Sequence, residues 1–415
     1  MTADVQSPSN TRPDHPTERI PPSDSSVLRI VDLESIAMSK NPTIAQAVRR
    51  VNALQGKCLQ VGLYPNPIIG YQGEEIGDEG AAGQQGMFVG QEVVTAGKLK
   101  LNRTVVSHEI EQARRELEMQ RLRVINSVRC RAYEAIVAQC TVDLNEQLVA
   151  IGEKGVNAAE TLRQAKEVSQ VDVLQARVEA NSAKLALSNA RNDYNAAWQR
   201  LAVVVGVPDM KPTPLADDLT AHVPELSWRD TVVRLLEESP ELAKAQSGVE
   251  RANCMLARAI AGRRPNFDVE AAVRYNNLSE STTATVGIGV PLQIFDRNQG
   301  NICRAQAELS VARREVDRIE LILQDKLAIA FKRYADARDQ TKQYKTQILP
   351  DAEHSLSLVQ KGYQEGEFGY LELLTTQRTY FHASLAYLKS LRELWLSTVE
   401  IQGLLLTGGL DSPGA

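Results

Sequence analysis

The chain has 415 residues, a formal net charge of −5 and 5% aromatic residues. A mildly acidic chain without a basic block gives no electrostatic reason to bind nucleic acid. Its five cysteines and five histidines are scattered, without a CxxC pair or metal-ligand spacing, so no metal site, cofactor or disulfide frame is expected. The sequence also lacks a nucleophile–base or phosphate-binding constellation, which argues against an enzyme.

Residues 1–30 are rich in Pro, Ser and Asp and predict a disordered polar leader. This leader has no apolar core of the kind that a signal peptide needs, so no export signal is visible. The first cysteine is Cys58, so an N-terminal lipid anchor is not indicated either. The longest apolar run, residues 201–207, is too short for a transmembrane helix.

The main feature of the rest of the chain is an internal duplication. Asn41-Pro42 recurs as Ser239-Pro240, 198 residues later, and in both copies an N-cap residue precedes a proline at the first helical position. Each copy predicts a helix, two strands and two long helices. The predicted organisation is a first repeat at 31–206, a linker at 207–228, a second repeat at 229–408 and a flexible tail at 409–415.

Two stretches in each repeat show the period-two alternation of β-strands. In the clearest, residues 267–276, Phe, Val, Ala, Val and Tyr occupy one face and mostly polar residues occupy the other. Its return strand is 283–290, and the first copy supplies weaker strands at 68–75 and 87–94. Such alternation fits a membrane β-strand with one side facing lipid. It equally fits a half-buried strand of a soluble protein.

The strands lead into helices of unusual length. Residues 97–164 and 298–364 carry apolar residues at spacings of three and four. This spacing predicts coiled-coil helices that extend roughly 100 Å at about 1.5 Å per residue. At the start of the second, Asp296 is expected to cap the helix, with Gln299 completing a capping-box-like start. An isolated antiparallel coiled coil would show the same spacing, so periodicity leaves that alternative open.

The predicted fold class is mainly α with a small β part, namely long antiparallel coiled-coil helices plus four β-strands per chain. Four strands leave two unpaired edges, which a sheet in a membrane cannot tolerate. If the strands face lipid, at least two chains must combine to complete a β-barrel. Straight helices of this length would then project far from that membrane.

Several short motifs occur along the chain, and the internal duplication repeats their order and spacing. They are Asn41-Pro42, YPNP at 64–67, QEVVTAGK at 91–98, KEVSQVDVL at 166–174, VPLQIFDRNQGN at 290–301 and GYQEGEFGYLELL at 362–374. Each motif is weak by itself. Together, over nearly all of residues 30–410, they make the chain resemble the TolC-type outer-membrane efflux channels, and the stretch 290–301 resembles their heavy-metal (cobalt–zinc–cadmium) branch.

This resemblance implies a homotrimer with a twelve-stranded barrel in outer-membrane lipid and a helical tunnel across the periplasm. It implies docking to a periplasmic adaptor (membrane-fusion) protein and an inner-membrane resistance-nodulation-division pump. The expected function is a passive exit duct for metal cations or small toxic compounds, without chemistry. The alternative is a soluble structural or adaptor coiled-coil protein, which the missing export signal favours.

In the resembled family the turns between paired helices form the closed entrance, and here they fall near residues 165–169 and 366–369. Asp172 matches the acidic residue that links neighbouring helices, and Tyr363 matches its tyrosine partner. Glu372 matches the first of two acidic residues that ring the constriction. The candidate residues of the helix tips are Lys166, Glu167, Val168, Ser169, Gly366, Glu367, Phe368 and Gly369.

Two positions depart from the pattern of that family. Thr375 replaces the second acidic residue of the constriction, and Phe368 replaces the arginine that completes the closing network. A ring of Glu372 carboxylates around a symmetric axis would concentrate cations and repel anions. The alternative without a functional role is that Asp172 and Glu372 are solvated acids in the first turn of a helix, where negative charge interacts favourably with the helix dipole. Their place at the tips favours the pore role for Glu372 and is neutral for Asp172.

Overall fold

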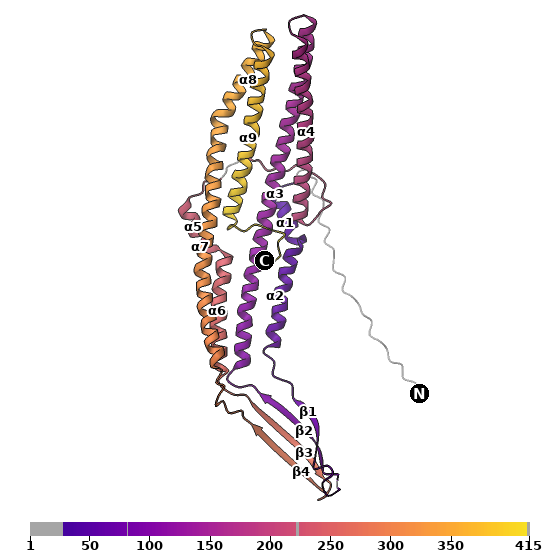
Figure 1. Ribbon diagram of the computed structural model, residues 1–415, viewed down its shortest axis with the longest axis vertical. Helices are drawn as coiled ribbons and strands as arrows, with labels where there is room; N and C mark the ends of the chain where they lie inside the picture. Colours follow the sequence, from indigo (N-terminus) through magenta and orange to yellow (C-terminus); the bar gives the residue numbers. More distant parts are fainter. Residues whose placement is uncertain (1–27, 81, 221–223, 413–415) are drawn as a thin grey trace, which may run out of the picture.

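The computed structural model describes residues 28–80, 82–220 and 224–412. The molecule is elongated, with long helices along its length, a β-sheet at one end and the turns between paired helices at the other (Figure 1). This architecture confirms the predicted fold class of long helices with a small sheet. Residues 1–27 of the leader predicted at 1–30 lie outside the described residues, whereas Leu28 forms a β-bridge with Leu215 and Ile30 begins α1.

The first repeat runs from the middle of the molecule to the sheet and then along its whole length. It begins with two short helices that lead into a β-hairpin, and a long helical hairpin follows. Its elements are α1 (Ile30–Lys40), α2 (Pro42–Gln60), β1 (Ile68–Glu74), the 3-10 turn η1 (Asp78–Gly80), β2 (Gln84–Val93), α3 (Lys98–Gln164) and α4 (Gln170–Val205).

The second repeat follows the same plan, and its long outward helix contains a short π-helical segment. Pro350 lies just after this segment and has no N–H to donate within the helix. Its elements are α5 (Trp228–Glu238), α6 (Pro240–Ala261), β3 (Phe267–Asn276), β4 (Ser281–Gly289), α7 (Gln299–Gln343), η2 (Tyr344–Ile348), α8 (Leu349–Gln364) and α9 (Tyr370–Gln402).

The duplicated helix starts have the predicted caps. The side chain of Asn41 accepts a hydrogen bond of 3.0 Å from the N–H of Thr43, and proline begins α2. The hydroxyl of Ser239 accepts one of 3.5 Å from the N–H of Leu242, and proline begins α6. Both start signals are confirmed, because proline at the first position loses no helical hydrogen bond and the capping oxygen satisfies an otherwise free amide.

The expected capping role of Asp296 is wrong. Asn298 is the residue before α7, and its φ of 59° is left-handed. Asp296 accepts a hydrogen bond from the N–H of Asn298 at 2.8 Å, and Gln299 accepts one from the N–H of Arg297 at 2.8 Å. The polar cluster therefore shapes the turn that precedes the helix. The left-handed residue delays the helix start, so Asp296 lies too early in the chain to cap it.

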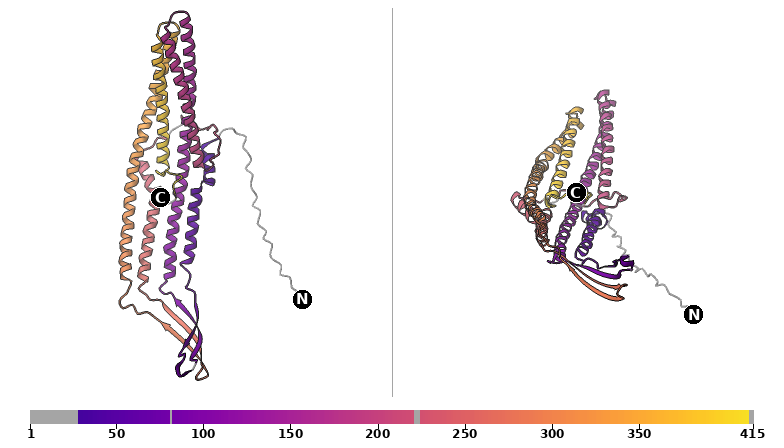
Figure 2. Two further views of the ribbon diagram at one scale, coloured as in Figure 1. Left: turned by 45° about the vertical axis from the view of Figure 1, so that its right-hand side comes forward. Right: turned by 60° about the horizontal axis from the view of Figure 1, so that its bottom comes forward.

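The four strands form one antiparallel sheet in the order β1-β2-β3-β4, and the two repeats meet where β2 pairs with β3. At that seam Met87 lies opposite Val273. Figure 2 shows that the sheet continues the row of helices and bends away from it. None of the helices within the described ranges combines the length and apolar composition that a membrane-spanning helix requires.

The main hydrophobic core sits at mid-length, where α1 packs against α3 and α4 around Leu33, Val124 and Trp198. A second core forms where α5 packs against α7 around Tyr334, whose hydroxyl donates to the carbonyl of Pro224 at 2.9 Å. The linker between the repeats is thereby fixed to the long helices. These cores hold the two helical hairpins side by side, so that both turns lie at the same end of the molecule (Figure 1).

Candidate functional site

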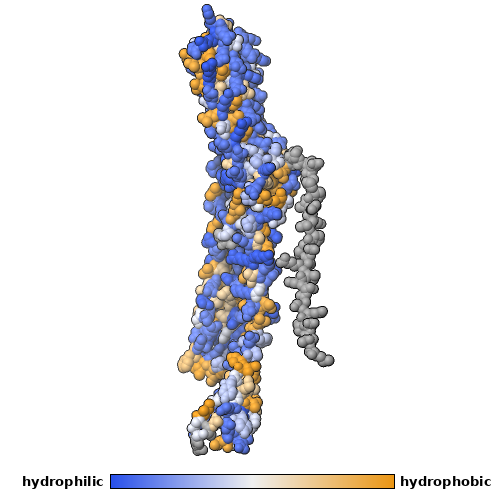
Figure 3. All heavy atoms as spheres, turned by 90° about the vertical axis from the view of Figure 1, so that its right-hand side faces the viewer, coloured by the Kyte–Doolittle hydropathy of each residue, from blue (hydrophilic) through white to orange (hydrophobic). Residues whose placement is uncertain are grey.

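One face of the sheet is apolar and exposed. The cross-strand pairs Tyr71–Met87 and Met87–Val273 share this face, and the three side chains are 64%, 61% and 57% exposed. Hydrophobic residues gather at this end of the molecule and where the sheet meets the helices (Figure 3). An exposed apolar surface of this extent marks a contact with lipid or protein. Other exposed apolar residues of the same face are Ile69, Val89, Val286 and Ile288.

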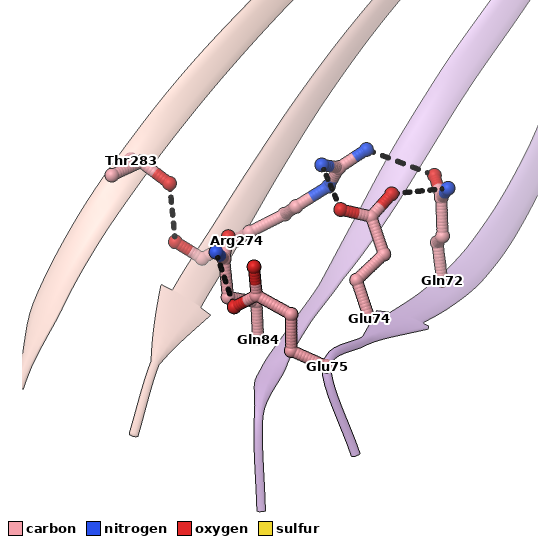
Figure 4. Close-up of polar contacts among 6 residues, drawn as sticks. All are labelled: Gln72, Glu74, Glu75, Gln84, Arg274 and Thr283. Carbon is pink, nitrogen blue, oxygen red and sulfur yellow. Dashed lines mark hydrogen bonds and ion pairs between the residues drawn. The ribbon is translucent and has the colours of Figure 1, made fainter. Parts of the chain in front are cut away.

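The opposite face of the sheet is polar. Arg274 of β3 crosses β2 to reach β1, where it donates hydrogen bonds to Glu74 at 2.9 Å and to Gln72 at 3.0 Å (Figure 4). Gly86 lies opposite Arg274, and a Cβ there would clash first with the carbonyl oxygen of Val273 and then with the backbone and side chain of Arg274. Other acids on this face are Glu92, Asp268 and Glu270.

Both edges of the sheet are free within the described residues, since β1 pairs only with β2 and β4 only with β3. An unpaired edge presents a row of backbone donors and acceptors that pair readily with another strand. A sheet with one lipid-compatible face cannot keep such edges in a membrane. Both edges of the sheet can therefore accept further strands.

The two turns at the opposite end share one backbone design. Lys166 and Gly366 both adopt left-handed conformations, with φ of 64° and 79°. In the first turn the N–H of Glu167 donates to the carbonyl of Leu162 at 2.9 Å, and the second turn repeats this bond at Glu367 at 2.8 Å. These are the six-residue bonds that close a helix C-terminus. The predicted tip residues accordingly sit at one end of the molecule, and all of them are exposed except the half-buried Val168.

The helices that follow the two turns begin differently, so the two candidate acids, Asp172 and Glu372, have different surroundings. Ser169 and Asp172 form a reciprocal capping box, in which the hydroxyl and the N–H of Ser169 donate to the carboxylate at 2.7 and 2.8 Å. These bonds hold the pKa of Asp172 below its usual value. Gly369 occupies the equivalent place before α9 and has no side chain to cap with. Glu372 is exposed, and its carboxylate has no hydrogen bond or ion pair within the described part of the chain.

Tyr363 is buried at the end of α8, directly before the second turn, with 8% of its surface exposed, and it packs against Val173 of α4. Burial, and then the nearby charge of Asp172, raise the pKa of its hydroxyl. No hydrogen bond joins the two side chains, and among the described residues the hydroxyl of Tyr363 has no partner. The aromatic ring of Phe368 lies over Gly362, where any Cβ would collide with it. Phe368 thus fills space in the second turn, where an arginine is expected.

A small hydrophobic cluster joins the two hairpin tips. Val173 from α4 packs with Tyr363 from α8 and with Tyr370 and Leu374 from α9. The two tyrosine rings lie 6.2 Å apart between centroids, in a tilted arrangement. Burial and neighbouring acids raise the pKa of Tyr370 to about 12. The tips therefore touch through neutral apolar and aromatic groups.

An ion pair behind the tips was not predicted from the sequence. Arg378 of α9 contacts Glu179 of α4 through two nitrogen–oxygen pairs, at 2.6 and 3.3 Å. A signal for this pair was present, since the two residues carry opposite charges at positions 199 residues apart, which is the offset of the duplication. Aligning the two repeats places these opposite charges at equivalent positions, but only the packing of the hairpins brings them into contact.

A family model described as "Outer membrane efflux protein" matches residues 33–207 and 231–405. The chain is 26% identical over 376 residues to the cobalt-zinc-cadmium resistance protein CzcC of Cupriavidus metallidurans, covering 89% of this chain and 88% of that protein.

Solved structures share the fold at low sequence identity. The outer membrane protein VceC of Vibrio cholerae is similar with a TM-score of 0.74 at 17% identity, over 91% of this chain and 96% of the other. The open state of the MtrE outer membrane channel of Neisseria gonorrhoeae is similar with a TM-score of 0.74 at 17% identity, over 93% and 91% of the two chains.

The family model matches the two repeats separately, from within α1 to just past α4 and from within α5 to just past α9. The matched ranges cover most of the chain, including the sheet and both helix tips. The protein therefore belongs to the outer membrane efflux protein family and is a TolC-type efflux channel of the outer membrane, a transport protein rather than an enzyme.

Proposed function

We propose that three copies of this chain form a trimeric exit duct, with a twelve-stranded barrel in the outer membrane and a helical tunnel through the periplasm. The observation that carries this proposal is the two-faced sheet with two free edges. Closing such a sheet requires strands from further copies. The apolar face then meets lipid, and the polar face with Arg274 and Glu74 lines the lumen.

The duct itself does not supply the driving force for export. A passive pore moves solutes only down their gradient, so net export requires an inner-membrane pump of the resistance-nodulation-division class. The helix tips lie at the end opposite the sheet and expose polar backbone and side chains, which suits docking to a periplasmic adaptor protein (Figure 1). The proposed docking residues are Lys166, Glu167, Val168, Ser169, Gly366, Glu367, Phe368 and Gly369.

We infer that Glu372 forms the charged constriction and that Asp172 and Tyr363 belong to the gating network. The carboxylate of Glu372 is exposed at the tip and is not held by a neighbour. Repeated around a symmetric axis, it would attract cations and repel anions. Asp172 is held by Ser169, so its part is to stabilise the turn beside Tyr363.

The proposed cargo is metal cations or small toxic compounds. Its support is the similarity to CzcC, which is named for resistance to cobalt, zinc and cadmium. A strain that lacks this channel should tolerate less of these metals, and the intact gene should restore growth. Unchanged metal tolerance in the deletion strain would contradict the metal part of this proposal.

Electrical recordings in a planar lipid bilayer test both pore formation and the ion selectivity of the proposed Glu372 constriction. The purified protein should form pores that prefer cations. The Glu372→Gln variant should lower the ratio of cation to anion permeability, because three carboxylates leave the constriction. The matched control is Glu237→Gln, which neutralises an exposed acid on α5, far from the tips. If the protein forms no pores, it is not a duct. If Glu372→Gln leaves the selectivity unchanged, Glu372 does not form the selective constriction.

A further inference from the structure

A cavity of about 700 Å³ lies where the helices meet the sheet, between α2, α3, α6 and α7. We call it the junction cavity. Four cationic side chains line it (Lys57, Lys98, Arg258 and Arg304), against one carboxylate, that of Glu109. Lys57 engages this carboxylate at 2.6 Å, and Arg304 forms an exposed ion pair with Glu308 at 3.6 Å. The junction cavity therefore holds a surplus of positive charge at the far end of the tunnel from the helix tips.

Two of these cations have no carboxylate partner. The ammonium group of Lys98 donates to the carbonyl of Arg264 at 2.6 Å and to the amide oxygen of Asn266 at 2.5 Å. The guanidinium of Arg258 donates to the amide oxygen of Asn102 at 2.6 Å. Within the described residues, neither group lies within 4.0 Å of an Asp or Glu oxygen. Both cations are held in place by neutral acceptors, and only the more distant charge of Glu92 partly offsets that of Lys98, so positive charge stays available to an anion.

The two cations are close enough to affect each other. Lys98 is 7% exposed, and burial followed by the charge of Arg258 lowers its pKa, while the charge of Glu92 partly opposes this shift. Folding therefore brings together two like charges at some electrostatic cost. An anion bound between them would relieve that repulsion, because it interacts favourably with both.

Two helix starts open on the same cavity. Lys98 is the first residue of α3, and Asn298 directly precedes α7. Neither helix has a side-chain cap, since Gly97 has no side chain and the side chain of Asn298 is turned to the carbonyl of Ala259 at 2.6 Å. The positive ends of two long helices thus add to the charge of the side chains.

Hydrogen bonds connect the lining of the junction cavity to the polar face of the sheet. Asn266 accepts from Lys98 and donates to Glu92 at 2.7 Å, and Glu92 pairs across the strands with Asp268 on that face. In the proposed duct this side is the lumen. The lining of the cavity is therefore linked to the surface that is proposed to face the aqueous tunnel.

We propose that the junction cavity binds a free oxyanion of the phosphate class. Two cationic groups from different helices and two helix starts favour a compact anion with several acceptor oxygens. The proposal concerns a bound anion, and it goes beyond the proposed passage of cargo. Its test below measures binding only, so it does not depend on pore formation.

Isothermal titration of the full-length protein in a phosphate-free detergent tests the site. Inorganic phosphate is titrated at constant sodium chloride concentration, and chloride alone gives the baseline. Saturable binding is expected, and Arg258→Gln should weaken it about tenfold, since a charge-assisted hydrogen bond contributes on the order of one power of ten in affinity. Glutamine keeps a donor for Asn102, so the fold is preserved in this variant. Arg304→Gln provides a second test at the rim.

The matched control is Arg314→Gln, which removes a cation from the same helix as Arg304 at a side chain that is 86% exposed. It should bind phosphate like the unmodified protein. A separate titration with short-chain phosphatidic acid tests a lipid source. Binding of the lipid but not of inorganic phosphate would overturn the proposal. So would the absence of binding, or equal affinity in Arg258→Gln and the unmodified protein.

Discussion

Arg378 and Glu179 join the two helical hairpins just behind the tips, with nitrogen–oxygen distances of 2.6 and 3.3 Å. The arginine side chain is 57% exposed and the glutamate side chain 22% exposed. Together with the cluster around Tyr363, this pair sets how firmly α9 is held against α4. Movement of one hairpin away from the other must break it.

Replacing Arg378 with alanine should make the entrance open more often. A partly exposed ion pair contributes about 0.5–1 kcal/mol, so the ratio of open to closed states should rise about two- to fivefold. Single-channel open probability in a planar bilayer measures this ratio. The control is Arg191→Ala, because Arg191 forms an exposed pair with Glu146 inside one hairpin. Equal open probability in the two variants would show that the Arg378 pair does not hold the entrance.

Acid should loosen the first turn through Asp172. The pKa of this carboxyl is lower in the folded protein than in the unfolded chain, because Ser169 donates to the carboxylate. Its stabilising effect is therefore present at neutral pH and is lost as the pH falls below about 3.9 and through the folded-state pKa. Hydrogen exchange at the start of α4, corrected for the intrinsic pH dependence, should accelerate in that range.

At neutral pH, the Asp172→Asn variant should already show this faster exchange. A helix N-cap interaction contributes about 1 kcal/mol, which corresponds to roughly a fivefold increase. The comparison variant is Glu372→Gln, which changes an acid at the equivalent place that caps nothing. If both variants exchange at the same rate, the capping box is not what stabilises the turn.

The left-handed residue of the first turn offers a stabilising substitution. Lys166 has a φ of 64°, whereas Gly366 adopts the same conformation in the second turn with a φ of 79°. Lys166→Gly should stabilise its turn by about 1 kcal/mol, because a side chain is strained in this conformation. Gly366→Ala should destabilise the second turn by a similar amount, although a Cβ there has open space around it. Thermal unfolding of the two variants should shift in opposite directions.

Charge on the two faces of β4 should have unequal effects on membrane assembly. Val286 lies on the apolar face and is 74% exposed, whereas the adjacent Thr285 lies on the polar face. Val286→Lys should destabilise the membrane-inserted protein by about 2–4 kcal/mol if the residue lies near the middle of the bilayer. Thr285→Lys is the matched control and should insert normally. The amount of folded protein in purified outer membranes measures the difference, and equal yields would contradict the proposed orientation.

Much of the fold followed from local sequence patterns. The clear alternation of 267–276 marked β3 to the residue, and the Asn41-Pro42 and Ser239-Pro240 pairs marked two helix starts. Family membership also removes the alternative of a soluble structural or adaptor protein. The residue that precedes α7 was predicted wrongly, because Asn298 is left-handed and its side chain bonds to the carbonyl of Ala259 in another helix, which the local pattern does not contain.

By itself the sequence determined the helix and strand periods, the duplication and the acids at the helix tips, because these features depend on neighbours a few residues away. Only the tertiary structure decided that Arg274 spans two strands to reach Glu74 and that Arg378 pairs with Glu179. It also assembled the junction cavity from four helices. These contacts join residues about 200 positions apart. Their partners are fixed by the packing of the two repeats, and no local pattern contains that information.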